Sequence, residues 1–157
     1  MKSSDVIACL MQYMFAGTSW AVVKELKPSV GFAGENRRLD LFAIECAPSK
    51  GMPKHAVEIK VSRADWLREV KQPLKRRMGM AISNYFWIAA PAGIVNPEEL
   101  PHHIGLLEIP DDWREQQRWG FGWLVKHPAE HRDAVRPTWS LVASLLRRPI
   151  IEQEPSA

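Results

Sequence analysis

The chain has 157 residues, of which 46% are hydrophobic and 25% are charged, and its formal net charge is +3. These values are ordinary for one soluble globular domain, and they leave no room for a second domain. No apolar run is long enough to cross a bilayer, so we expect no membrane partner. Asp5, Gln12 and Tyr13 interrupt the N-terminal apolar segment, which argues against a signal peptide. Cys9 and Cys46 both lie among apolar residues, which predicts two buried thiols and a reducing cytoplasm.

The first third of the chain predicts one helix followed by three strands. Apolar residues recur at helical spacing over residues 3–15, with Ser3 or Ser4 as N-cap and Gly17 ending the helix. Runs of β-prone residues, separated by proline and glycine, then predict strands at residues 20–26, 38–44 and 56–62.

A second helix should begin directly after the third strand, because Ser62 and Asp65 form a capping box. Three apolar residues of this helix are expected to face the core: Trp66, Leu67 and Val70. Pro73 breaks the helix and can start a further helical segment that reaches about residue 81.

The rest of the chain predicts further strands and one more helix. Strands are expected at residues 85–90, 104–109 and, less regularly, 122–126, with a surface excursion over 110–120. The last helix should cover 138–148, with Leu141, Val142, Leu145 and Leu146 on one side. We therefore assign residues 1–149 to a single domain and residues 150–157 to a flexible tail.

The strand at 56–62 carries the most informative pattern in the sequence. Its apolar residues alternate with Glu58, Lys60 and Ser62, so the carboxylate and the ammonium share one face. The preceding strand contains one acid, Asp40, which a neighbouring strand would bring beside Glu58. Two carboxylates and a lysine at one place suit a hard divalent cation and a phosphodiester.

Glu-x-Lys is a weak motif by itself, and the chain contains it three times, at Glu25, Glu58 and Glu69. The first lies at a strand end and the third in a helix, where residues two apart do not share a face. Only Glu58 lies within an apolar strand, after an acid-bearing strand and before a basic helix. The alternative is a solvent-facing ion pair.

Positive charge is concentrated directly after this strand. Residues 63–77 contain six bases and two acids. A basic cluster beside a metal site favours a polyanionic partner, because neutralising phosphates releases counterions. A solvated helix face is the alternative.

These residues resemble the PD-(D/E)xK nuclease superfamily and, within it, the MmcB-like DNA repair proteins. The resemblance covers about residues 3–125 and rests on Arg38-Leu39-Asp40, Glu58-Ile59-Lys60 with Ser62, Ala64-Asp65, Lys71-x-Pro73, Tyr85-Phe86-Trp87, Leu100-Pro101 and Gly105-Leu106. It implies an α/β fold with a restriction-endonuclease-like core of order α-β-β-β-α-β, in which helices flank a central mixed sheet. Leucine rather than proline precedes Asp40, and Leu74-Lys75 replaces an acid and an aromatic residue found in many relatives.

The resemblance also implies a mechanism. Asp40, Glu58 and the backbone carbonyl of Ile59 would supply oxygen ligands to Mg²⁺ or Mn²⁺. The metal would activate a water and polarise the scissile phosphoryl group. Lys60 would orient that water or offset charge in the transition state. Glu25 is either an additional ligand or a plain exposed strand residue.

The residues expected to contact DNA are Arg38, Arg63, Lys71, Gln72 and Lys75. For Lys71 and Gln72, a solvated helix end is the alternative to a phosphate contact. Trp113 and Trp119 could stack on bases or face a partner, although structural packing is the simpler interpretation.

The sequence therefore predicts a metal-dependent DNA endonuclease of repair or recombination type, with its site at one sheet edge. One rival is a nuclease-like fold that binds DNA without cutting it and serves as a repair scaffold. The other is an unrelated domain in which Glu58 and Lys60 form a surface pair. A homodimer is left open, because the apolar first and last helices could cover either a dimer seam or the sheet.

Overall fold

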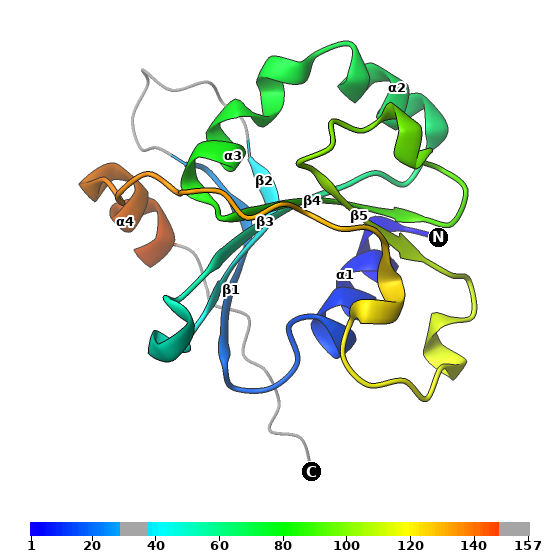
Figure 1. Cartoon of the computed structure of the whole chain (residues 1–157), viewed down its shortest axis with the longest axis horizontal. Helices are drawn as coiled ribbons and strands as arrows, with labels where there is room; N and C mark the ends of the chain where they lie inside the picture. The colour runs from blue at the N-terminus through cyan, green and yellow to red at the C-terminus, as the bar shows by residue number, and fades with distance from the viewer. Residues whose placement is uncertain (29–37, 148–157) are drawn as a thin grey trace.

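The computed structural model describes residues 1–28 and 38–147, which form one six-stranded sheet with helices on both faces (Figure 1). In chain order the elements are α1 (Ser3–Tyr13), β1 (Trp20–Leu26), β2 (Leu39–Glu45), β3 (Lys54–Ile59), α2 (Arg63–Val70), the 3-10 helix η2 (Pro73–Arg76), α3 (Arg77–Ile82), β4 (Tyr85–Pro91), β5 (Gly105–Ile109), the 3-10 helices η4 (Trp113–Glu115) and η5 (Gly122–Leu124), β6 (Val125–His127) and α4 (Trp139–Leu146). The expected α/β class, with a central mixed sheet and flanking helices, is confirmed.

The strands follow one another across the sheet in the order of the sequence. β1, β2 and β3 form an antiparallel meander, β3, β4 and β5 are parallel, and β6 closes the sheet antiparallel to β5. A parallel pair needs a long crossover. The chain supplies it between β3 and β4 as α2, η2 and α3.

Two apolar layers hold the helices against the sheet. α1 packs on one face through buried residues such as Leu10 and Tyr13. The opposite face is covered by α2 and α3, with Trp66 and Ile82 buried against Phe86. Figure 1 shows α1 and the α2–α3 pair on opposite sides of the strands, with α4 beside α3.

Helix α2 corrects one expectation. Trp66 is fully buried as predicted, but Leu67 and Val70 are 42% and 38% exposed. Glu69 is buried instead. With 3.6 residues per turn, Trp66 and Glu69 share the face that turns toward the sheet, while Leu67 and Val70 lie at its flanks. The capping box is confirmed, because the Ser62 Oγ accepts the Asp65 N–H at 3.2 Å.

Several element boundaries differ from the predicted ones by one to three residues, among them the following three. Helix α1 begins after Lys2 as N-cap, and the Asp5 carboxylate accepts the Lys2 N–H at 2.9 Å. Strand β3 ends at Ile59, so Lys60 follows the strand. The strand expected at 122–126 divides into η5 and β6.

Three side chains, those of Cys46, Leu146 and Trp119, lie in environments that differ from those expected, whereas Trp113 is packed as expected. Cys9 is buried but Cys46 is exposed, and both are free thiols. Leu146 is 83% exposed on the outer side of α4. Trp113 is buried beside Tyr13, which rules out base stacking by this residue, whereas Trp119 is 98% exposed. The tail predicted from residue 150 lies outside the described residues.

No helix in the described part of the chain is long and apolar enough to cross a membrane.

A buried histidine anchors an aromatic cluster at the start of β3 and β4. The Trp87 Nε1–H donates to His55 Nδ1 at 3.1 Å, and the Tyr85 ring stacks on the imidazole at 4.8 Å. Trp20 meets the same ring edge-on at 5.3 Å. Burial lowers the pKa of His55 to about 4. The imidazole is therefore neutral at physiological pH.

The first prediction concerns this histidine. In the unfolded chain His55 takes up a proton near pH 6.5, whereas the folded chain resists protonation down to about pH 4. The contribution of His55 to stability is therefore complete above pH 6.5 and falls by about 2–3 kcal/mol as the pH drops to 4. Urea unfolding of the wild type and of His55→Gln between pH 4 and 8 measures this loss of stability. Glutamine is the replacement because its side chain still offers Trp87 a hydrogen-bond acceptor. Parallel stability curves for the two proteins would contradict the assignment.

The second prediction concerns Gly105, which pairs with Trp87 across β4 and β5. A Cβ at this position would collide with Cε3 and Cζ3 of the Trp87 ring and lie 2.8 Å from the Ala129 Cβ. Gly105→Ala should therefore lower the unfolding free energy by about 2–3 kcal/mol in a denaturant titration. Gly122→Ala is the matched control, because nothing lies within 4 Å of its added Cβ. Equal stabilities of the two variants would refute the steric explanation.

Candidate functional site

The candidate site lies where β2 and β3 separate. Their antiparallel pairing runs from Ile44–Lys54 to Leu41–Val57 and stops there. One residue further, the Asp40 Oδ2 accepts the Ile59 N–H at 2.7 Å. The Asp40 carboxylate thus accepts the hydrogen bond of a main-chain N–H that would otherwise bond to the backbone of the neighbouring strand.

This arrangement brings the two predicted acids together. The carboxyl groups of Asp40 and Glu58 lie close enough that each acts on the pKa of the other. Burial, followed by repulsion from Asp40, raises the pKa of Glu58 to about 8 against the attraction of Lys60. Burial also raises the pKa of Asp40, although the Ile59 N–H and Lys60 oppose that shift. At Glu58, burial and repulsion from Asp40 therefore outweigh the attraction of the neighbouring Lys60 ammonium.

Lys60 lies beside this pair and forms ion pairs with Glu58 and with a further acid, Glu69. Its Nζ is 3.7 Å from the Glu58 Oε2 and 3.2 Å from the Glu69 Oε2 on α2. Burial disfavours its ammonium form, but attraction by Glu58, Glu69 and Asp40 outweighs burial and raises the pKa of Lys60. Its main-chain N–H donates to the Ala89 carbonyl at 2.9 Å. Lys60 is thus fixed at both its backbone and its side chain.

Arg76 extends the charged cluster beneath α2. Its Nε lies 4.0 Å from the Glu69 Oε1, and its side chain is only 5% exposed. Burial lowers the pKa of Arg76, opposed by Glu69 and Glu58. The Arg76 Nη1 is buried without a hydrogen-bond partner among the described residues. Sequence reasoning missed the involvement of both Glu69 and Arg76, although the shared face of Trp66 and Glu69 on α2 was readable from the sequence.

Glu25, the third predicted acid, lies near this cluster and has an unusual backbone. Its φ is +50°, in the left-handed region that non-glycine residues seldom adopt. Its carboxylate pairs with Arg38 at 3.1 Å and is 62% exposed, while its charge still acts on the pKa of Asp40. Whether Glu25 binds a metal therefore stays a prediction. Val23 and Leu26 on either side of it are both buried in the α2–α3 layer.

The residues expected to contact DNA fall into two groups. Arg63 is occupied, because its guanidinium binds the Glu99 carboxylate in a bidentate pair, with one contact of 2.6 Å. The hydrogen bond from Arg63 lowers the pKa of Glu99 to about 2. Lys71 and Gln72 are exposed, and Lys75 is half-buried. In residues 1–28 and 38–147 neither Lys71 nor Lys75 forms an ion pair, so both are available to an anion.

The position of the site corrects the expectation of a sheet edge. β2 and β3 are interior strands of the six-stranded sheet, and β1 forms the edge on their side. Asp40 near the start of β2 and Lys60 just after β3 meet at the same end of the sheet because these strands are antiparallel.

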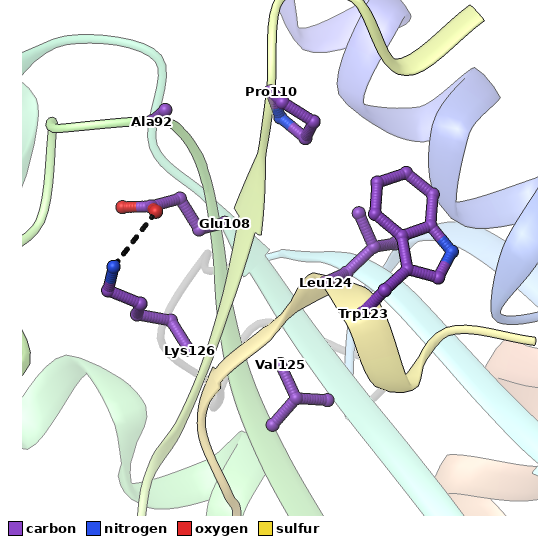
Figure 2. Close-up of a pocket in the computed structure, with 7 residues that line it drawn as sticks. All are labelled: Ala92, Glu108, Pro110, Trp123, Leu124, Val125 and Lys126. Carbon is purple, nitrogen blue, oxygen red and sulfur yellow. Dashed lines mark ion pairs between the residues drawn. The ribbon is translucent and has the colours of Figure 1, made fainter. Parts of the chain in front are cut away.

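A cavity of about 220 Å³ lies elsewhere, beside β5 and β6. Figure 2 shows its two kinds of wall, with the Glu108–Lys126 ion pair on one side and Trp123 and Pro110 on the other. The Glu108 Oε1 and Lys126 Nζ are 3.4 Å apart. None of the predicted site residues lines this cavity.

The third prediction tests the electrostatic cost of the acid pair. The raised pKa of Glu58 means that the unfolded chain releases this proton first, so stability falls as pH rises from about 4.5 to 8. Glu58→Gln should remove that loss and be about 1 kcal/mol more stable than the wild type at pH 8, with a smaller gain at pH 4.5. Thermal or urea unfolding at both pH values measures the difference, with the exposed Glu115→Gln as control. A destabilised Glu58→Gln at pH 8 would show that the pair holds the fold together.

Comparisons with known proteins bear on the fold alone. No protein-family model matches the chain, and no curated protein matches it. Among solved structures, it is similar to the SPO1766 protein of unknown function from Silicibacter pomeroyi, with a TM-score of 0.59 and 18% sequence identity. The match covers 93% of this chain and 85% of that one. The two chains therefore share an architecture.

Proposed function

We propose that this protein is a metal-dependent DNA endonuclease of repair or recombination type, acting in the cytoplasm. One observation carries the proposal: the carboxyl groups of Asp40 and Glu58 lie together where β2 and β3 separate, and the Lys60 ammonium lies 3.7 Å from Glu58. Two acids and an amine in contact are the groups that hydrolysis of a phosphodiester requires.

The order of the elements supports the resemblance to the PD-(D/E)xK nucleases. With η2 and α3 counted with α2 as one helical crossover, the elements from α1 to β4 run α-β-β-β-α-β, the order expected of a restriction-endonuclease-like core. Asp40 lies on the second strand, Glu58 lies near the end of the third, and the basic helix comes next. This order supports the proposal.

The donor atoms fit Mg²⁺ or Mn²⁺. Among the residues that the structure describes, no group of three histidine, cysteine or acidic side chains is arranged to hold a metal. Mg²⁺ needs fewer, because it usually keeps several waters and takes one or two carboxylates. Asp40 and Glu58 supply those carboxylates, and a cation would oppose the burial that raises the pKa of each of them. The Ile59 carbonyl is the expected third ligand.

Each residue of the site then has one task. A bound divalent ion would lower the pKa of a water and polarise the phosphoryl oxygen. Asp40 and Glu58 hold their carboxylates on one side of the phosphate position. Lys60 orients the attacking water or offsets the negative charge that develops on the phosphoryl group. Lys71 and Lys75 neutralise neighbouring phosphates of the DNA backbone.

A DNA-binding repair scaffold that does not cut is the second candidate. The burial of the site favours it, since the side chains of Glu58 and Lys60 are only 17% and 13% exposed. The bases on and after α2 would still bind phosphates in such a protein.

The fourth prediction separates these two functions. The wild type should cut plasmid or branched DNA with Mg²⁺ or Mn²⁺ and not with EDTA. Asp40→Ala and Lys60→Ala should each lower the cleavage rate at least 100-fold, because each removes a group that stabilises the transition state. Their DNA affinity, measured by fluorescence anisotropy in Ca²⁺, should stay within about threefold of the wild type.

Asp111→Ala and Lys126→Ala are the matched controls, because Asp111 is exposed and Lys126 pairs with Glu108 away from the site. Both should cut like the wild type. DNA binding without any cutting by the wild type would leave the scaffold as the function.

A further inference from the structure

We infer that Glu69 is the residue that positions Lys60 for catalysis, with Arg76 holding Glu69 in turn. This inference rests on the proposed function, because it assigns a task to the second layer of the same site. Neither residue belongs to the Asp40, Glu58 and Lys60 set that the sequence predicts.

The distances identify the residue that anchors Lys60. The Glu69 carboxylate lies 3.2 Å from the Lys60 Nζ, whereas the Glu58 carboxylate lies 3.7 Å away. The nearer contact comes from helix α2 and not from the strand that carries Lys60. Anchoring from α2 leaves the Glu58 carboxylate able to bind a cation while the ammonium stays beside it.

The burial of Glu69 and Arg76 shows that this contact is built into the fold. Their side chains are 7% and 5% exposed, which is unusual for charged residues on a helix. A helix that only covered the sheet would place an apolar residue at position 69, since burying an ion pair seldom stabilises a protein. Leu67 and Val70 were available on the same helix, yet they are 42% and 38% exposed. Helix α2 therefore buries Glu69, the residue that contacts Lys60, while these two apolar side chains stay partly exposed.

Arg76 completes the arrangement from η2. Its Nε faces the Glu69 Oε1 at 4.0 Å, and its buried Nη1 has no hydrogen-bond partner in the described part of the chain. An unsatisfied buried donor destabilises the folded state. The fold retains this unsatisfied donor on Arg76, whose positive charge keeps the Glu69 carboxylate directed toward the site. Charges thus alternate from Arg76 through Glu69 and Lys60 to Glu58.

The test uses Glu69→Gln, which keeps the shape of the side chain and removes its charge. Lys60 then keeps only the more distant Glu58, and its Nζ becomes mobile. We expect the turnover rate on DNA to fall at least tenfold, with DNA affinity in Ca²⁺ within about twofold of the wild type. Glu69→Asp keeps the charge on a shorter side chain, so its turnover rate should lie between those of the wild type and Glu69→Gln. Glu98→Gln, which changes an exposed glutamate, is the matched control.

A second measurement does not depend on cleavage. Brief treatment with acetic anhydride, followed by peptide mass spectrometry, reports how far each lysine amine is both unprotonated and open to the reagent. Lys60 should be modified much more slowly than the exposed Lys71 in the wild type, and at least fivefold faster in Glu69→Gln. The rate at Lys71 should be unchanged.

The outcomes separate the two proposals. An unchanged Lys60 labelling rate in Glu69→Gln overturns the positioning role, whether or not the wild type cuts DNA. Faster labelling in a protein that never cuts overturns the nuclease proposal, and with it the catalytic task of Glu69. If Glu69→Gln does not fold because Arg76 is left unpaired, Glu69→Gln combined with Arg76→Met removes both charges and takes the same two measurements. Wild-type turnover in that folded double variant also overturns the inference.

Discussion

The hydrogen bond from the Ile59 N–H to the Asp40 carboxylate is the interaction on which the candidate site depends. It lies one residue beyond the last strand pair, Leu41 with Val57. There a side chain replaces a main-chain partner, which satisfies the backbone while the strands move apart. The same bond fixes Asp40 against β3, so that its carboxyl group meets Glu58. Without it, either the strands would stay paired or a main-chain donor would be left unsatisfied.

Charge in this protein is buried as a connected set and not as isolated groups. Asp40, Glu58, Lys60, Glu69 and Arg76 come from two strand ends and the crossover helices, yet each interacts with the next. Such a set contributes little to stability, because desolvation offsets most of the attraction between the charges. Its worth lies in fixing side-chain positions. The fold buries these charges in spite of the desolvation cost, and it does so at the end of the sheet that carries the candidate site.

The sequence predicted the fold and the acid pair well, because both follow from short-range patterns. Period-two alternation found β3, and the Ser62 capping box found the start of α2. What failed depends on contacts between distant segments. Hydrophobicity predicted that Leu67 and Val70 face the core, but the ion pair with Lys60 makes Glu69 the buried residue. Trp113 is packed in the core beside Tyr13, in agreement with the favoured structural interpretation, whereas Trp119 is exposed.

The backbone of Glu25 has a consequence for the whole edge of the sheet. In an uninterrupted strand, residues three apart point to opposite sides. Val23 and Leu26 are three apart and yet lie in the same layer, and the left-handed residue Glu25 lies between them. A β-branched residue at position 25 would resist that conformation and turn Leu26 out of its layer, whereas glycine would accept it freely.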